Sequence, residues 1–323
     1  MKRRTLAGLT AIGLLASLST YAQEAFPSRI RIVTAFSAGS GPDAMLRVIA
    51  DNLSTAWKTP VIVDNKPGGS GFIAITEAKR SAPDGATLLH IEGMNVTAVP
   101  HMYAKLPYSA KRDLLPITSL HGNYFYVAVP ADSRYQTAGQ LISAAKAAPN
   151  KVSFGSWQIG SIAHLGGEML SDRAGVAMLH VPYKENSALY TSLARGDIDW
   201  AFASIASAGN LQKAGKLRFI AVAGPQRDIA HPEVPTVAES GGPAGFEASS
   251  WVGLFAPAGT PAPLIARMNA DINKVLQSDA IASRMKDVGY TSMGSSVAAM
   301  NALIDRQGDE LGKAVKKINL TLD

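Results

Sequence analysis

Three glycine- and serine-rich segments of the sequence could bind a small anion. They span residues 37–41, 67–71 and 156–161, and each lies between an expected strand and an expected helix. Backbone N–H groups at the start of a helix attract negative charge, and glycine lets an anion approach them closely. A tight turn without a ligand is the alternative at each segment. We expect anion binding because all three would lie at the carboxyl ends of parallel strands, where open α/β sheets bind ligands.

The first segment also matches a dinucleotide-binding pattern. Residues 39–44 read Gly-Ser-Gly-Pro-Asp-Ala, which fits G-x-G-x-x-[GA], and Asp64 ends the next expected strand. Two features argue against a nucleotide. The carboxylate of Asp43 in the first helical turn would repel a pyrophosphate, and the chain carries an export signal. We therefore expect a small anion at this segment and no cofactor.

The residue types that would support catalysis do not form a recognisable group. The serines do not fit G-x-S-x-G, and the sequence contains no H-E-x-x-H. His164 and Glu168 are one helical turn apart, but a single His–Glu pair is more often a helix-surface hydrogen bond than a metal site. The sequence has no cysteine, which excludes a thiolate nucleophile and cysteine-ligated metals. We expect a binding protein without a metal, and a periplasmic enzyme is the alternative from another class.

The first residues have the pattern of a secretory signal peptide. Three basic residues at positions 2–4 precede an apolar stretch at 6–18 and a small-residue cleavage site at 20–22. The apolar stretch is shorter than the roughly 20 residues that span a membrane. We therefore expect residues 1–22 to be removed and the mature chain to begin at Gln23 in the periplasm.

Composition and charge limit the class of protein further. The chain has 323 residues, of which 47% are hydrophobic and 17% charged, enough apolar material for two cores. Its net charge of +6 falls to +3 once the three basic residues of the signal peptide are removed. No run of lysine or arginine is present, so nucleic-acid binding has no support. A mild positive charge suits a small anionic ligand.

Strand-like and helix-like segments alternate along the mature sequence. Strands are expected at residues 30–36, 61–64, 87–92, 124–129, 152–156, 178–181, 198–203 and 217–222. Helices are expected at residues 42–57, 72–79, 137–148, from 162 on, and at 185–195, 261–277, 279–288 and 297–318. This alternation predicts parallel sheets with helices on both faces, arranged as two α/β lobes.

Eight short motifs occur in an order that resembles a known family. They read IVTAFSAGSGPD at 32–43, VDNKPGG at 63–69, APDG at 82–85, KLPY at 105–108, HVPYK at 180–184, AGKLR at 214–218, VPTVAE at 234–239 and APAGTP at 256–261. Together they cover essentially the whole mature chain. The sequence resembles the Bug-type substrate-binding proteins of tripartite tricarboxylate transporters.

The resemblance implies a type II periplasmic binding protein fold, or Venus flytrap, in which each lobe is a mostly parallel sheet flanked by helices. Lobe 1 would comprise residues 23–122 and 224–323, and lobe 2 residues 123–223. The chain would cross near His121–Asn123 and near Ala223–Pro225, and closure would bury a ligand between the lobes. The resemblance also implies a monomer that serves a membrane permease of the tripartite tricarboxylate type, with an orphan ligand sensor as the alternative.

Family members hold a carboxylate through main-chain N–H groups and ordered waters, and the matching positions can be assigned one by one. The first binding loop matches Phe36, Ala38, Gly39, Ser40, Gly41 and Asp43, the second Gly69, Ser70 and Gly71, and the third Ser156, Ser161 and His164. The role of Asp43 stays open between capping the helix and receiving a donor from the ligand or a water.

Four departures from the family pattern bear on the ligand. Phe72 stands where asparagine is common, Trp157 where a small residue is usual, Ala203 where aspartate is common, and Glu185 where glycine is usual. Phe72 and Trp157 suggest a flat apolar lining that stacks on a ring, and the missing acid at Ala203 argues against an amino acid. We expect an aromatic carboxylate, such as a benzene dicarboxylate with one acid group on each of two loops. If Phe72 and Trp157 face the lobe cores instead, the ligand is an aliphatic di- or tricarboxylate.

Overall fold

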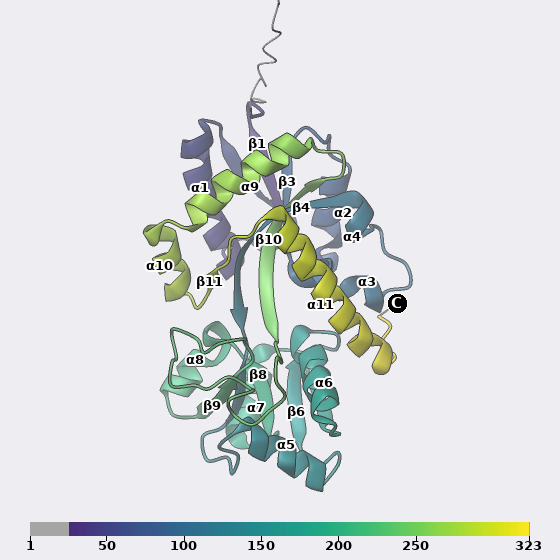
Figure 1. Cartoon of the computed structure of the whole chain (residues 1–323), viewed down its shortest axis with the longest axis vertical. Coiled ribbons are helices and arrows are strands. Elements are labelled where there is room, and N and C mark those ends of the chain that lie inside the picture. The colour runs from purple at the N-terminus through teal and green to yellow at the C-terminus, as the bar shows by residue number, and fades with distance from the viewer. Residues whose placement is uncertain (1–25, 323) are drawn as a thin grey trace, which may run out of the picture.

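The computed structural model describes residues 26–322 as two α/β lobes that follow one another along the long axis of the molecule (Figure 1). Each lobe has one sheet with helices on both of its faces, so the expected two-lobe α/β fold is confirmed. The expected signal peptide, residues 1–22, lies outside the described residues.

Lobe 1 is built on a six-stranded sheet. Its strands, in spatial order, are β11 (Thr291–Ser292), β4 (Leu114–Tyr124), β10 (Ser249–Pro257), β3 (Thr87–Glu92), β1 (Ile30–Thr34) and β2 (Val61–Asn65). The longer elements around it are α1 (Gly41–Trp57), α2 (Phe72–Lys79), α9 (Ala262–Leu276), α10 (Asp279–Asp287) and α11 (Val297–Lys317). The short ones are η1 (Gly69–Gly71), η2 (Gly93–Asn95), α3 (Val99–Met102) and α4 (Ala110–Asp113).

Amphipathic helices close the core of lobe 1. In α1 the buried residues Met45, Ile49 and Leu53 recur at helical spacing and pack against the sheet. The facing side of α9 contributes Leu264 and Met268 to the same cluster. Each of these two helices buries its apolar face against the sheet. This packing fixes the position of the first turn of α1 relative to the end of β1.

Lobe 2 is built on a five-stranded sheet. Its strands, in spatial order, are β7 (Leu179–Tyr183), β6 (Ser153–Trp157), β8 (Trp200–Ala203), β5 (Tyr126–Pro130) and β9 (Leu217–Val222). Its helices are α5 (Ala138–Ala147), α6 (Ile162–Ala174), α7 (Asn186–Arg195) and α8 (Ile205–Lys213). Three aromatic side chains, Phe154, Trp200 and Phe202, are fully buried in its core.

The sheets are mixed, which corrects the expectation of mostly parallel sheets. In lobe 1, β10 is antiparallel to both β3 and β4, and β11 is antiparallel to β4. In lobe 2, β5 is antiparallel to both β8 and β9. The cause is the double crossing between lobes. Because β4 leaves lobe 1 and β10 returns to it, the two strands run in opposite directions and pair antiparallel.

The contacts of residues 224–248 bear on where the chain returns to lobe 1. This segment packs on lobe 2: Ser240 Oγ accepts a hydrogen bond from the N–H of Ala138 at 2.8 Å, and the N–H of Ala248 donates to the carbonyl of Ala223 at 2.9 Å. These contacts favour a return at the start of β10, near Ser249. The division into lobes, with crossings near residues 121–123 and 223–225, stays a prediction.

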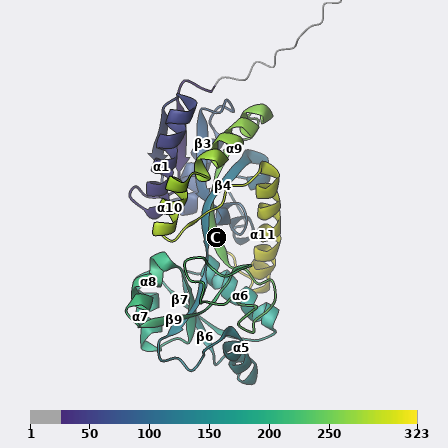
Figure 2. The ribbon, with the colours of Figure 1, turned by 60° about the vertical axis from the view of Figure 1, so that its left-hand side comes forward.

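Helix α11 also links the lobes. Its first half packs on the sheet of lobe 1, where Met300 lies against Gly253 of β10. Its second half runs beside α6 of lobe 2 (Figures 1 and 2), where Arg173 pairs with Glu310 at 3.2 Å. The long helix therefore contacts both lobes along one side of the molecule.

Candidate functional site

The carboxyl ends of several strands in each lobe face the other lobe. Strand β4 leaves lobe 1 at its carboxyl end, β10 runs opposite to β4, and β3 runs opposite to β10, so β3 and its parallel neighbours β1 and β2 point towards lobe 2. In lobe 2, β5 runs away from the junction, so β8, β6 and β7 point back. The expected binding loops therefore face the junction: loop 1 (residues 36–41), loop 2 (residues 67–72) and loop 3 (residues 156–161).

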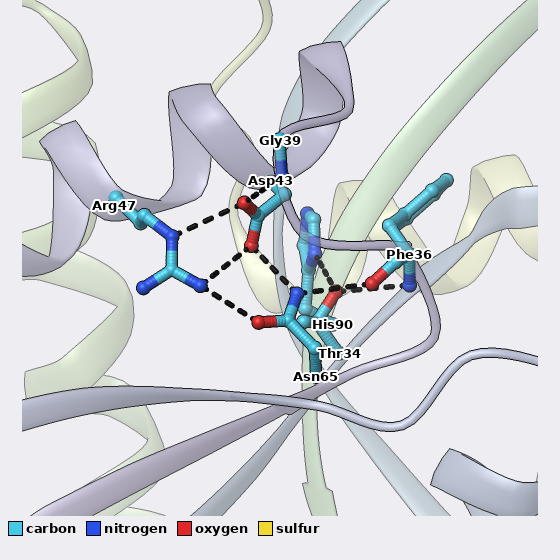
Figure 3. Close-up of polar contacts among 7 residues, drawn as sticks. All are labelled: Thr34, Phe36, Gly39, Asp43, Arg47, Asn65 and His90. Atoms are coloured by element: carbon cyan, nitrogen blue, oxygen red, sulfur yellow. Dashed lines mark hydrogen bonds and ion pairs between the residues drawn. The ribbon is translucent and has the colours of Figure 1, made fainter.

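Asp43 holds loop 1 in shape. Its side chain is buried, with 1% of the residue exposed, and lies between Arg47 and Asn65 (Figure 3). Its Oδ2 accepts hydrogen bonds from the N–H of Gly39 at 2.8 Å and from Arg47 Nε at 3.1 Å, and its Oδ1 accepts from Asn65 Nδ2 at 2.7 Å. Burial alone would raise the pKa of Asp43, but these bonds outweigh it and hold the pKa below its ordinary value of 3.8.

The first turn of α1 is left without a side-chain cap. Ser40 occupies the N-cap position, yet its Oγ is buried and makes no hydrogen bond among the described residues. The N–H groups of Gly39 and Ser40 already donate to Asp43 and to the carbonyl of Ser37. Those of Gly41 and Asp43 donate to no described atom. The donors left for a ligand therefore lie at Gly41 and Asp43, beyond Gly39 in the chain.

Phe36 is fixed by a buried polar pair beneath loop 1. Thr34 Oγ1 accepts from the N–H of Phe36 at 3.3 Å and lies 2.9 Å from His90 Nδ1 (Figure 3). The rings of Phe36 and His90 lie 5.1 Å apart. Burial lowers the pKa of His90 to about 3, so the imidazole is neutral at physiological pH. Ala38, the remaining expected residue of loop 1, is exposed.

Loop 2 is a strained turn that a side chain of η2 stabilises. Ser70 has a φ of 51°, in the left-handed region, between Gly69 and Gly71, which also have positive φ. Asn95 Nδ2 donates to the carbonyl of Ser70 at 2.7 Å. Phe72 lies outside this turn, as the first residue of α2.

Phe72 is half-buried and packs on other aromatic residues of lobe 1. Its ring lies edge-on to Tyr103 at 5.3 Å and to Tyr108 at 5.9 Å. The side chain thus contacts the hydrophobic core of its own lobe, which is the arrangement that we associated with an aliphatic ligand.

Loop 3 has most of its side-chain polar groups paired. Ser156 is fully buried, and its Oγ shares a hydrogen bond with His180 Nε2 at 2.7 Å. Ser161 caps α6 as expected, because its Oγ accepts from the N–H of His164 at 3.3 Å. His164 Nδ1 accepts from the N–H of Gly160 at 3.1 Å, and its ring stacks on His180 at 3.8 Å. Burial lowers the pKa of both histidines to about 4.

Two expected residues of lobe 2 differ in their accessibility. Trp157, at the carboxyl end of β6, is half-buried and lies 5.5 Å from Phe125, where the chain enters lobe 2. Ala203 is fully buried in the core beside Tyr126. Like Phe72, Trp157 packs on the hydrophobic core and keeps part of its surface exposed, whereas Ala203 is fully buried.

The sequence reasoning did not find Tyr290, which lies at loop 1. A Cβ atom placed on Gly41 would lie 2.8 Å from Tyr290 Oη, and the ring of Tyr290 stacks on His121 at 4.3 Å. The preceding residue touches lobe 2, because a Cβ on Gly289 would lie 3.2 Å from Ile205 Cβ. No motif marks this position, since Tyr290 follows a short helix nearly 250 residues after loop 1.

Residues 26–322 contain no group of three or more His, Cys, Asp or Glu side chains placed to hold a metal ion. In the same residues, no helix is long and apolar enough to cross a bilayer.

Comparisons with known proteins agree with this architecture. A protein from Pseudomonas sp. strain P51, described as a UPF0065 protein in the tcbD-tcbE intergenic region, is 33% identical over 320 residues, 99% of this chain and 95% of that protein. The structure of periplasmic binding protein BugD is 26% identical with a TM-score of 0.69, covering 92% of this chain and 99% of that one. R. palustris Rpa4515, solved with adipate, is 26% identical with a TM-score of 0.73, covering 91% and 98%.

A family model, described as the tripartite tricarboxylate transporter family receptor, matches residues 45–320. The match spans most of both lobes, including α1 after its first turn, both sheets apart from β1, and α11. The chain belongs to the family of tripartite tricarboxylate transporter receptors, the TctC or Bug-type binding proteins.

Proposed function

We propose that this chain is a periplasmic solute-binding protein that captures a small carboxylate between its lobes for a tripartite tricarboxylate-type permease. Its family and its structural relatives are binding proteins, and one of those relatives was solved with adipate, a dicarboxylate. Export by the expected signal peptide, a monomeric state and the permease partner belong to this proposal.

The observation that carries the proposal is the uncapped start of α1. Of the helices that begin at the same junction, α6 and α8 are capped by serines, because Ser161 accepts from His164, and Ser204 and Ser207 form a reciprocal capping box. Helices α2 and α7, like α1, have no side-chain cap. Ser40 occupies the matching position on α1 and caps nothing. Free N–H donors and the positive end of the helix dipole therefore suit a ligand carboxylate at Gly41 and Asp43.

We further propose that the ligand carries an aromatic ring. The exposed part of Trp157 supports this preference, and Phe36 on loop 1 supplies a second partly exposed ring on the opposite lobe, although both rings also pack on the core of their lobe. Stacking on such rings contributes about 0.5–1.5 kcal/mol beyond burial. Phe72 does not support it, because its ring packs on Tyr103 and Tyr108. An aliphatic di- or tricarboxylate is therefore the second candidate.

Titration calorimetry of the exported protein tests the ligand class, with terephthalate, phthalate, benzoate, adipate, citrate and succinate as titrants. We expect at least one carboxylate to bind, and bound ligand to raise the melting temperature, because a ligand at about 100 times its Kd stabilises the folded state by about 2.7 kcal/mol. Binding of no carboxylate would contradict the proposal. Steady formation of a product from any titrant would favour an enzyme instead.

The permease partner needs a separate experiment. A closed, ligand-bound receptor can deliver its ligand only if the permease distinguishes it from the open form. We expect a pull-down from native membranes to recover a permease more strongly with ligand than without it. Recovery of no membrane protein in either condition would favour the orphan sensor.

A further inference from the structure

A partly buried carboxylate at the junction has no cationic partner. Glu92 is the last residue of β3, and its Oε1 accepts a hydrogen bond from Ser250 Oγ at 2.9 Å. No lysine, arginine or histidine among residues 26–322 forms an ion pair with it. Asp43, at the same edge of the sheet, is by contrast saturated by Arg47, Asn65 and Gly39. Glu92 therefore keeps acceptor capacity that the protein does not use.

Sheet register places Glu92 in one row with His121. Val252 of β10 pairs with Glu92 on one side and with His121 on the other, so the three side chains lie on the same face of the sheet. This is the face covered by α1, because Val252 belongs to the same buried cluster as the apolar residues of that helix. Glu92 and His121 thus flank one position of β10 close to the start of α1.

Tyr290 connects this row to the start of α1. Its ring stacks on His121, and its hydroxyl lies at Gly41 without a hydrogen bond to any described residue. Burial and then the negative charge of Glu92 raise the pKa of Tyr290, which agrees with their proximity. His121 is 2% exposed, and its Nε2 has no partner among the described residues. Unpartnered polar atoms in buried positions usually have a water or a ligand as partner.

We propose that Glu92 and Tyr290 form a second subsite beside the α1 start, in which Glu92 accepts a hydrogen bond from a hydroxyl or ammonium group on the ligand. The Tyr290 hydroxyl then donates to the carboxylate held at Gly41. This inference rests on the proposed function, since the carboxylate positions the second group.

The charge of the Glu92 carboxylate determines which ligand groups this subsite selects. A carboxylate without a cation attracts a hydroxyl or an ammonium group and repels a second carboxylate. A ligand with a donor next to its bound carboxylate should therefore bind better than the same skeleton without one. Hydrogen bonds to charged groups correspond to about tenfold or more in affinity.

The test uses ligands matched in skeleton: succinate, malate and aspartate, which differ in one hydrogen, hydroxyl or ammonium group, and terephthalate with hydroxyterephthalate. We expect the wild-type protein to bind the donor-bearing member of at least one set about tenfold more tightly. Glu92→Gln should reduce that preference, more for ammonium than for hydroxyl, because an amide oxygen still accepts from a hydroxyl. If Glu92→Gln loses more affinity for aspartate, the natural ligand carries an ammonium group. If it loses more affinity for malate, the natural ligand carries a hydroxyl group.

Glu233→Gln is the matched control, because Glu233 is exposed and pairs with His231 in the segment 224–248, which packs on lobe 2. It should leave the preference unchanged. Tyr290→Phe provides a second variant if Glu92→Gln does not fold, and it should weaken all the carboxylates. Equal affinity of wild type for the members of each set, or an unchanged preference in Glu92→Gln, would overturn the subsite while leaving the proposed function in place. Binding of no carboxylate at all would overturn both.

Discussion

Asn65 Nδ2 donates hydrogen bonds to both Asp43 Oδ1, at 2.7 Å, and the carbonyl oxygen of Phe36, at 3.0 Å. One amide group on β2 thus connects the start of loop 1 to the first turn of α1. Among the described residues, the carboxylate of Asp43 accepts hydrogen bonds from the loop and from two neighbouring side chains.

Removal of Asn65 should loosen loop 1. In Asn65→Ala the Phe36 carbonyl and one Asp43 oxygen lose a donor in a partly buried site, which costs about 1–3 kcal/mol of folding free energy. We expect ligand affinity to fall as well, measured by calorimetry beside thermal unfolding. Asn52→Ala is the control, because Asn52 bonds only to a carbonyl on the exposed side of α1. Equal effects of the two substitutions would contradict the role of Asn65.

The two N-cap serines should respond in opposite ways to the same substitution. Ser161→Ala removes a cap bond and should cost about 1 kcal/mol of stability. Ser40→Ala removes no such bond, so its stability should stay close to wild type, while carboxylate affinity falls because the site lies at that helix start. Chemical denaturation and calorimetry measure both quantities. A loss of about 1 kcal/mol in Ser40→Ala with unchanged affinity would argue that α1 holds no ligand.

Buried histidines should make the protein sensitive to acid. Burial lowers the pKa of His121 from its ordinary 6.5 to about 3, so the unfolded chain binds this proton first as pH falls. The stabilisation is complete above pH 6.5 and is lost as pH falls towards 3, at about 1.4 kcal/mol per pH unit. His121→Phe keeps the ring on Tyr290 and should flatten the dependence of unfolding free energy on pH in that range. An unchanged slope would contradict the assignment.

Trp157 and Phe72 should differ as ligand contacts. Trp157→Ala should weaken an aromatic carboxylate several-fold more than an aliphatic one, because stacking contributes about 0.5–1.5 kcal/mol. Phe72→Ala should lower stability through lost packing on Tyr103 and Tyr108 and leave the aromatic-to-aliphatic ratio unchanged. If neither substitution changes the ratio, the aliphatic ligand class is favoured.

Local signals in the sequence predicted much of the fold. The spacing of Met45, Ile49 and Leu53 predicted α1, and Ser161 before Ile162 predicted the start of α6. Strands β4 and β10 were missed along most of their length. Both are buried, yet β4 carries Thr118, Ser119 and His121 inside, so its pattern does not resemble an apolar strand. Their antiparallel pairing depends on contacts between segments more than 100 residues apart.

The sequence predicted the three backbone loops of the candidate site but not the side chains that complete it. Glycine and serine near helix starts indicated the three loops, because their conformations are locally encoded. Side chains that complete the site come from distant segments: Asn65 from β2, Glu92 from β3 and Tyr290 from beyond α10. No local pattern brings these residues together, since sheet register and helix packing place them.

The last residues of the chain offer a position for an optical sensor. The N–H of Leu322 donates to the carbonyl of Met102 in lobe 1 at 2.9 Å, and a Cβ on Gly160 of lobe 2 would lie 3.4 Å from Leu322 Cδ1. Because the sequence has no cysteine, a single Leu322→Cys substitution can be labelled with a dye at one site. A polarity-sensitive dye there, next to Gly160 of loop 3, would convert a change in the spacing of the two lobes into a change in fluorescence.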